Sequence, residues 1–182
     1  FYVKLQMTKL VINHLYFRKM KISVVALTFF ILFGCSEVKD ENYLFRSIDP
    51  TVSKLDFTNE LKETNNLSIL YYLYFYNGGG LAIGDINNDG LQDLYFTGNQ
   101  VPNKLFLNKG NMEFEDITVN AGIAGHSDWN TGVTMADING DGHLDIYVCA
   151  VVGIHGLKGK NELFINNGDL TFSEKGKEFG LD

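Results

Sequence analysis

The stretch that decides the fold is Asp85-Ile86-Asn87-Asn88-Asp89-Gly90-Leu91-Gln92-Asp93. Oxygen-bearing side chains stand at its positions 1, 3, 5 and 9, and a glycine stands at position 6. Calcium takes oxygen ligands from carboxylates, amides, backbone carbonyls and water, and a glycine permits the sharp turn of such a loop. The pattern returns 52 residues later as Asp137-Ile138-Asn139-Gly140-Asp141-Gly142-His143-Leu144-Asp145. One copy would also fit an ordinary turn, so the repetition is what indicates paired calcium loops.

These loops do not fit the EF-hand, which needs a bidentate glutamate at position 12 and a helix on each side. Position 12 is Phe96 in the first copy and Val148 in the second. The flanking segments are short apolar runs rich in residues that favour strands, so each loop is expected to connect two strands. The carboxylates at position 9, Asp93 and Asp145, are then expected to close the two sites.

The internal repeat extends beyond the loops. Residues 80–95 align with residues 132–147, with eight of sixteen positions identical, and residues 103–110 align with residues 161–168 at an offset of 58. The extra residues of the second copy fall in a glycine-containing loop at 152–160. Each copy is predicted to form four strands, with a hairpin after the metal loop. A repeat of about 50 residues with four short strands is typical of a β-propeller blade.

The N-terminal part has the organisation of a targeting segment. A basic start, an uncharged apolar run and a small residue before a cysteine indicate a secretory signal at residues 20–34. The ending Leu32-Phe33-Gly34-Cys35 resembles the bacterial lipobox, in which the cysteine is lipidated, although Phe33 stands where a small residue is usual. We expect an upstream extension at 1–19, lipidation of Cys35 and a polar tether at 35–52.

Composition limits the classes of function. The chain of 182 residues is 45% hydrophobic, which is typical of a globular protein. Its formal net charge is −7, and a nucleic-acid-binding protein would need a basic face instead. There are two cysteines, and Cys149 lies in an apolar run, so we expect it to be a buried, unreactive thiol.

Four other segments have competing interpretations. The apolar run at 67–76 (LSILYYLYFY) is predicted to be a buried strand, and the glycines at 78–80 a tight turn rather than a phosphate-binding loop. The run His126-Ser127-Asp128 has the residue types of a catalytic triad, but a triad is defined by spatial geometry, and a catalytic role is not expected. Trp129 could stack on a sugar ring; packing between blades is the favoured interpretation.

The segments GDINNDGLQDLYF and ADINGDGHLDIYV resemble FG-GAP/VCBS repeats, the calcium-bearing blades of integrin-α-like propellers. The region from about residue 53 to 182 is similar to the N-terminal part of large Bacteroidota lipoproteins that combine VCBS repeats with a cartilage-acidic-protein-like (ASPIC/UnbV) region. The resemblance implies two Ca²⁺ sites, with backbone carbonyls from Leu91 and His143 at position 7 of the loops. The side-chain ligands it implies are Asp85, Asn87, Asp89, Asp93, Asp137, Asn139, Asp141 and Asp145.

The predicted fold is all-β: an incomplete β-propeller of about two four-stranded blades with calcium loops, preceded by a lipoprotein signal helix. The propeller occupies residues 53–182, with repeat 1 at about 78–122 and repeat 2 at about 130–180, and it is expected to be a fragment of a longer protein. The predicted function is a non-catalytic module for adhesion or for binding a glycan or protein, lipid-anchored in the outer membrane and facing the cell surface. The alternative is a scaffold within a polysaccharide-degrading hydrolase or lyase.

Overall fold

The structure is a computed structural model, and it describes residues 44–182. The chain divides into two units, Phe1–Arg46 and Ser47–Asp182, and the strands of the described residues all lie in the second unit. Among the described residues, no helix is both long and apolar enough to cross a lipid bilayer. The expected signal segment at 20–34 and the expected lipidation site at Cys35 lie outside the described residues.

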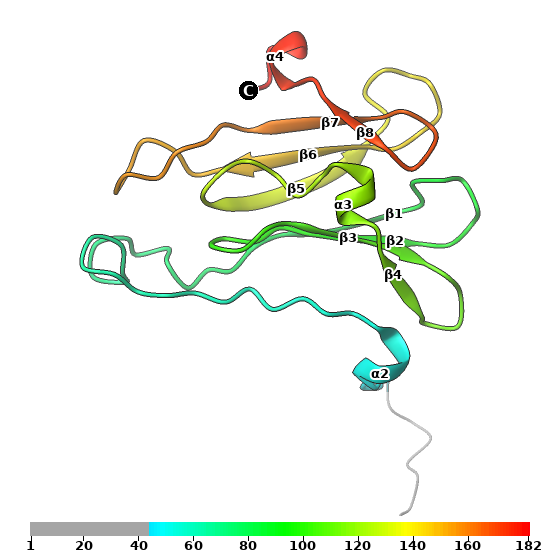
Figure 1. Ribbon diagram of the computed structural model, residues 1–182, viewed down its shortest axis with the longest axis horizontal. Helices are drawn as coiled ribbons and strands as arrows, with labels where there is room; N and C mark the ends of the chain where they lie inside the picture. The colour runs from blue at the N-terminus through cyan, green and yellow to red at the C-terminus, as the bar shows by residue number, and fades with distance from the viewer. Residues whose placement is uncertain (1–43) are drawn as a thin grey trace, which may run out of the picture. The chain divides into compact units, whose positions relative to one another are not determined.

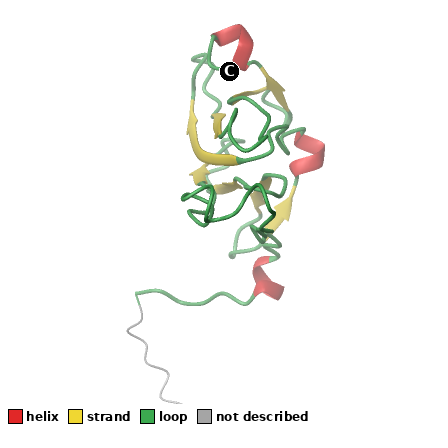
Figure 2. Cartoon of the chain, turned by 90° about the vertical axis from the view of Figure 1, so that its left-hand side faces the viewer, coloured by secondary structure: helices red, strands yellow, loops and turns green. Residues whose placement is uncertain are grey.

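Two four-stranded antiparallel sheets make up the second unit, and they lie one on the other in Figure 1. The first sheet has the order β1-β2-β3-β4, and its strands are Leu81–Gly84, Asp93–Phe96, Lys104–Asn108 and Phe114–Asp116. The second sheet has the order β5-β6-β7-β8, and its strands are Asn130–Ala136, Asp145–Ala150, Glu162–Asn166 and Phe172–Glu174. Figure 2 shows that these short strands are joined by long loops. The prediction of two four-stranded sheets is confirmed, and the described residues do not form a closed ring.

Each sheet is a meander in which every strand pairs with the next one along the chain. In the first sheet Tyr95 lies opposite Ala82 and Leu105, and in the second Tyr147 lies opposite Thr134 and Leu163. The register is therefore the same in both repeats. A one-turn helix follows the last strand of each sheet: α3 (Thr118–Ala121) after β4 and α4 (Gly176–Phe179) after β8. A third short helix, α2 (Pro50–Ser53), precedes the first sheet.

The two sheets contact each other through their first strands, β1 and β5. Glycine is required at this contact, because a Cβ atom on Gly80 would lie 2.6 Å from the carbonyl oxygen of Thr131. A Cβ on Gly84 would lie 2.8 Å from the Met135 sulfur, so that flexible side chain would have to move. Gly80 therefore allows the first sheet to approach the second, which adds a packing role to the turn predicted from the sequence, whereas its repeat equivalent, Gly132, has no such close neighbour.

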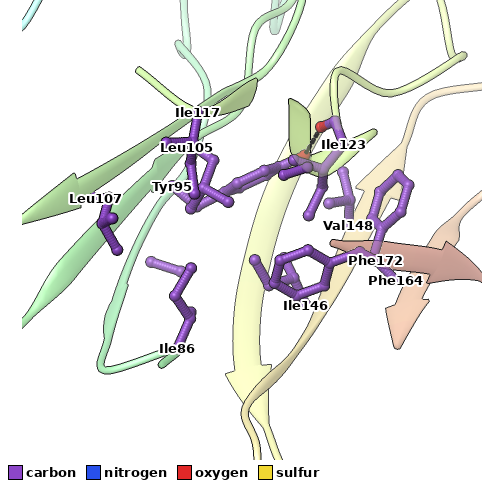
Figure 3. Close-up of a cluster of buried hydrophobic side chains, with 12 residues drawn as sticks. Ile86, Tyr95, Leu105, Leu107, Ile117, Ile123, Ile146, Val148, Phe164 and Phe172 are labelled. Atoms are coloured by element: carbon purple, nitrogen blue, oxygen red, sulfur yellow. Dashed lines mark hydrogen bonds between the residues drawn. The ribbon is translucent and has the colours of Figure 1, made fainter. Parts of the chain in front are cut away.

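The main hydrophobic core lies between the sheets. Figure 3 shows side chains of both sheets directed toward one another, with the Tyr95 hydroxyl donating a 2.8 Å hydrogen bond to the Ile123 carbonyl. The labelled residues are Ile86, Tyr95, Leu105, Leu107, Ile117, Ile123, Ile146, Val148, Phe164 and Phe172, and all are buried. Burial raises the pKa of the Tyr95 hydroxyl far above its usual range, so this group stays protonated and remains a donor.

Equivalent residues of the two repeats differ in burial. Ile123, just after α3, is fully buried, whereas Leu181, just after α4, is 39% exposed. The hydroxyl of Tyr147 bonds to the Leu181 carbonyl at 3.0 Å, as that of Tyr95 bonds to Ile123, yet Tyr147 is only partly buried. The second sheet covers Ile123 and Tyr95 of the first repeat. Among residues 47–182, no further sheet covers Leu181 and Tyr147, which are the equivalent residues of the second repeat.

An extended segment at residues 54–62 runs along the first sheet. The ring of Phe57 stacks on that of Phe96 with centroids 5.0 Å apart. Asn59 is held by Asn99, whose backbone N–H donates to the Asn59 side-chain oxygen at 2.9 Å. The folded part was expected to begin at about residue 53, before the first repeat. These preceding residues pack onto the first sheet.

The prediction of a buried strand at 67–76 is wrong. The segment forms consecutive turns, with backbone hydrogen bonds from Tyr72 N to Ser68 O at 2.8 Å and from Phe75 N to Tyr72 O at 2.9 Å. Tyr72 and Phe75 are buried against Trp129, with ring centroids 5.5 and 5.4 Å from the tryptophan ring. Leu67 is also buried in this cluster, and the remaining large side chains are exposed; they are Ile69, Leu70, Tyr71, Leu73, Tyr74 and Tyr76.

Candidate metal loops

The two Asp/Asn/Gly loops occupy equivalent places in the two sheets. Residues 85–92 join β1 to β2, and residues 137–144 join β5 to β6 (Figure 1). The loops also touch each other, because the Asn88 side-chain amide donates to the Gly142 carbonyl at 3.1 Å. The first and second expected sites are therefore neighbours at one end of the stacked sheets.

Within the first loop, the side-chain oxygens turn inward onto the backbone. Asp85 accepts from the N–H groups of Asp89 and Gly90 at 3.1 and 2.7 Å. Asn87 accepts from Asp89 N at 3.2 Å, and Asp89 accepts from Leu91 N at 2.8 Å. The side-chain oxygens at positions 1, 3 and 5 of the pattern thus accept hydrogen bonds from the backbone of one tight turn.

The second loop repeats these four bonds and adds one, from Gly140 N to Asp137 at 2.7 Å. Asp137 accepts from Asp141 N and Gly142 N at 3.1 and 2.9 Å. Asn139 accepts from Asp141 N at 2.9 Å, and Asp141 accepts from His143 N at 2.8 Å. The same side chains therefore face the same backbone groups in both copies, which extends the identity of the two loops from sequence to geometry.

Left-handed backbone conformations close each turn. In the first loop φ is +60° at Asn88 and +86° at Gly90, and in the second it is +77° at Gly140 and +89° at Gly142. Glycine and asparagine adopt this region at low cost, and other residues rarely do. The Asn/Gly content of the loops is thus required by their shape, whether or not an ion is bound.

The carboxylates at position 9 have a structural role that the sequence did not reveal. Asp93 is fully buried, and its two oxygens accept from Ile86 N at 2.9 Å and from Asn108 N at 2.8 Å. Asp145 is also fully buried and accepts from Ile138 N and Asn166 N at 2.9 and 2.8 Å. Each carboxylate thus ties the start of its metal loop to the end of the third strand.

The carboxylates of a loop differ in their electrostatic environment. Burial raises the pKa of Asp93, the charges of Asp89 and Asp85 raise it further, and its backbone hydrogen bonds oppose the shift. The hydrogen bond from the Asn87 side chain, followed by that from Leu91 N–H, lowers the pKa of Asp89. The exposed Asp89 is therefore held ionised, beside a buried carboxylate that a nearby cation would stabilise in its charged form.

The donor set matches calcium in chemistry. Each loop offers three carboxylates and one amide, all hard oxygen donors of the kind that Ca²⁺ takes. The seventh residues, Leu91 and His143, lie at the end of each tight turn, where their N–H groups bond to the fifth-position aspartates. Within residues 44–182, no group of three or more His, Cys, Asp or Glu side chains is already arranged to hold a metal ion.

A buried asparagine joins the two loops across the sheets. The side-chain amide of Asn166 donates to the carbonyl of Ile86 in the first loop at 2.8 Å and to that of Leu144 in the second at 3.2 Å. Its repeat equivalent, Asn108, makes the corresponding bond within its own sheet, to Gln92 O at 2.8 Å. The sequence analysis did not single out these two asparagines. Both occur at the same position in the alignment of residues 103–110 with 161–168, and this repetition is the signal that could have identified them.

The triad-like residues do not form a triad. His126 Nδ1 lies 2.8 Å from Glu162 Oε1. Ser127 Oγ donates to Lys160 O at 2.8 Å, and Asp128 accepts from Lys158 N at 2.8 Å. In the described part of the chain no hydrogen bond joins the three side chains to one another, and Ser127 and Asp128 instead anchor the inserted loop.

Cys149 is a free, partly buried thiol, so the expectation of full burial was too strong.

Comparison with known proteins identifies the repeat. Residues 85–148 match the model of the FG-GAP-like repeat. The chain is 32% identical to cartilage acidic protein 1 of Xenopus tropicalis over 132 residues, which is 70% of this chain and 19% of that protein. It is 36% identical to the human cartilage acidic protein 1 over 72 residues, which is 39% of this chain and 11% of that protein.

The mouse cartilage acidic protein 1 is 36% identical over 69 residues, 38% of this chain and 11% of that protein. The chain thus spans less than a fifth of the length of these relatives. The metal loops and the strands around them lie in the region matched by the family model. Residues 85–148 therefore carry an FG-GAP-like repeat, and the chain is homologous to a part of cartilage acidic protein 1.

Proposed function

We propose that this chain is a calcium-binding β-propeller segment of a lipid-anchored cell-surface protein, and that it serves as a non-catalytic module for adhesion or for binding a glycan or protein. One observation carries the calcium part: the two loops place the same oxygens on the same backbone groups in two equivalent sheets. Two neighbouring copies of the same loop, each with three carboxylates, are better explained as two calcium sites than as two ordinary turns.

In this proposal Asp85, Asn87, Asp89 and Asp93 hold the first ion, and Asp137, Asn139, Asp141 and Asp145 hold the second. The backbone carbonyls of Leu91 and His143 complete the sites. Calcium would neutralise the carboxylates that crowd each loop and would rigidify the turn between the first two strands. Its role is structural, since the loops fix one end of both sheets and leave the other end free for a ligand.

Calcium is expected to protect the protein against heat and denaturant. Extracellular calcium modules bind with Kd of about 10⁻⁴–10⁻³ M, so millimolar concentrations are needed to fill them. An ion at a hundredfold excess over Kd stabilises the folded state by about 2.7 kcal/mol per site. Asp89→Ala and Asp141→Ala should each remove most of the protection from one site. Thermal melting of the full protein with calcium and with excess chelator measures the effect.

The matched control is Asp56→Ala, which removes an exposed carboxylate outside both loops. This variant should keep the full calcium-dependent shift in melting temperature. A shift that is absent in the unmodified protein, or that survives both loop substitutions unchanged, contradicts the calcium proposal. Magnesium at the same concentration should protect less, because it demands a smaller and more regular set of ligands.

Support for a non-catalytic role comes from the arrangement of polar side chains. The triad-like residues are engaged separately with Glu162, Lys160 and Lys158, so they form no hydrogen-bonded relay. The aspartates that recur in both repeats are those of the two loops, whose chemistry suits an ion. A binding module needs only a shaped surface at the other end of the sheets.

The anchor is proposed from the sequence of residues 20–35. Cleavage before Cys35 and lipid attachment to its sulfur are expected to hold the protein on the outer membrane. Cys35→Ala should abolish incorporation of a labelled fatty acid and release the protein from the membrane fraction or leave an unprocessed precursor. Cys149→Ala is the control, because Cys149 is a partly buried strand residue. Unchanged labelling of the Cys35→Ala protein contradicts the proposal.

A further inference from the structure

A hollow of about 290 Å³ lies at the end of the sheets away from the metal loops. Strands β1 and β5 begin beside the hollow and end at the metal loops, since Gly80 precedes β1 and Thr131 and Gly132 lie in the first part of β5. The hollow therefore sits where the two sheets meet. It is lined by Tyr72, Tyr74, Asn77, Gly78, Gly79, Gly80, Trp129, Thr131 and Gly132.

The lining is aromatic and polar, and it carries no charge. Three of the nine lining residues are aromatic, four are glycines whose backbone is accessible, and the other two are Asn77 and Thr131. Among the described residues, no aliphatic and no charged side chain contributes to this lining. This composition is unusual in a chain of net charge −7 with many exposed aliphatic residues, and it restricts the class of ligand.

The floor of the hollow is rigid. The buried Trp129 ring is packed edge to face against Tyr72, at 5.5 Å and 85°, and it also contacts Phe75. A Cβ on Gly79 would lie 1.9 Å from the Thr97 carbonyl oxygen, so only glycine allows the backbone to lie this close. A rigid site loses little conformational entropy when a ligand binds.

Free hydrogen-bonding groups surround this floor. In the part of the chain that the structure describes, the side-chain amide of Asn77 and the hydroxyls of Tyr72 and Tyr74 make no hydrogen bond to another residue. Tyr74 is 63% exposed, and its ring centroid lies 5.8 Å from that of Tyr72. The exposed Tyr74 ring and these polar groups are thus available on the same small surface, above the buried rings of Tyr72 and Trp129.

We propose that this hollow binds a neutral pyranose ring of a glycan. The inference rests on the binding role in the proposed function and names its ligand class. A pyranose presents an apolar face of C–H groups, which packs on an aromatic ring, and a rim of hydroxyls, which bond to amides and to tyrosine hydroxyls. An apolar peptide side chain or a lipid chain would bind better to a pocket lined by aliphatic side chains. Among the described residues, no aliphatic side chain lines this hollow.

The absence of charge in the lining predicts selectivity among sugars. A uronate or a sulfated sugar would bury an anionic group with no cation among the described lining residues to compensate it, in a chain that is already acidic. Neutral hexopyranosides are therefore expected to bind more tightly than the corresponding uronates. Single-ring ligands are expected to bind weakly, in the millimolar range of affinity, because few contacts are available to each.

Trp129 gives the experiment an internal probe, because it is the single tryptophan of the chain and lines the hollow. The full protein in millimolar calcium is titrated with neutral methyl pyranosides of the gluco, galacto and manno series and with the matching uronates, and tryptophan fluorescence is followed. At least one neutral sugar should change the emission saturably. Tyr74→Ala should weaken binding at least tenfold, whereas Tyr71→Ala, equally exposed but outside the lining, should leave it unchanged.

Several results overturn the proposal. They are the failure of all neutral sugars to bind, uronates binding as tightly as neutral sugars, an equal loss in the Tyr71→Ala control, and an aromatic peptide competing for the site more tightly than any sugar. A concentration-dependent change in sedimentation that Tyr74→Ala abolishes would assign the surface to a second copy of the chain and also overturn it. The calcium-dependent shift in melting temperature is measured on the same samples, and Tyr74→Ala should leave it intact. Failure of sugar binding with an intact shift contradicts the sugar proposal alone, and it is thereby distinguished from failure of the calcium proposal.

Discussion

Ile123→Ala is expected to lower the free energy of unfolding by about 2–5 kcal/mol, which is the usual cost of removing a large aliphatic side chain from a packed core. Ile123 is fully buried between the sheets, and its carbonyl accepts the hydrogen bond from Tyr95. Leu181 stands at the same place in the second repeat, just after the glycine that ends the short helix, and it is 39% exposed. Leu181→Ala should therefore cost less than about 1 kcal/mol.

Denaturant unfolding of the full protein in calcium measures both variants against the unmodified chain. The comparison is matched, because the two residues occupy equivalent positions and each substitution removes a side chain of the same size. The predicted difference arises only from the sheet that covers Ile123. Equal losses would show that Leu181 is covered in solution, by a further sheet or by a second molecule, and would make the exposed face of the second sheet an interface.

The two-sheet architecture could be predicted because local and repeated signals agree. The metal-loop pattern sets the number of residues between the first two strands of each sheet. The glycine-containing hairpin sets the number of residues between the last two. Tyr95 and Tyr147 were aligned by the repeat, and they occupy the same register in the two sheets. Since each strand pairs with its neighbour in sequence, no long-range information was needed to order them.

The segment at 67–76 could not be predicted in this way. Its apolar run suggests a buried strand, but within the described residues the segment pairs with no strand, and β1 remains the edge of the first sheet. The segment instead folds into turns that place Tyr72 and Phe75 against Trp129. The contact between Tyr72 and Trp129 joins residues far apart in the sequence, and neither composition nor periodicity carries that information.

The position-9 carboxylates show the limit of reading a site from a pattern. The sequence places Asp93 and Asp145 in a ligand pattern, and we propose them as ligands. The structure adds that both are fully buried and that each bonds to backbone N–H groups of two different segments. One residue type at one position can thus serve both the fold and the ion, and only the three-dimensional contacts reveal the first role.

These two roles lead to different results with and without calcium. Asp93→Ala, measured in excess chelator, is expected to lower the free energy of unfolding by about 2–4 kcal/mol. The substitution leaves the N–H groups of Ile86 and Asn108 without an acceptor, at about 1–3 kcal/mol each, and removal of a poorly solvated charge returns part of that cost. Asp89→Ala in chelator should cost less than about 1 kcal/mol, because Asp89 is exposed and water replaces its contacts.

In millimolar calcium both substitutions should also remove the protection that the first site provides, so the loss for Asp89→Ala should grow and approach that for Asp93→Ala. Asp93→Asn keeps the volume and one acceptor, and it should cost less than Asp93→Ala in chelator while still abolishing protection at the first site. Denaturant unfolding of the three variants in calcium and in chelator gives the six values. If Asp93→Ala and Asp89→Ala cost the same in chelator, the buried carboxylate does not tie the loop to the third strand, and its burial is explained by the ion alone.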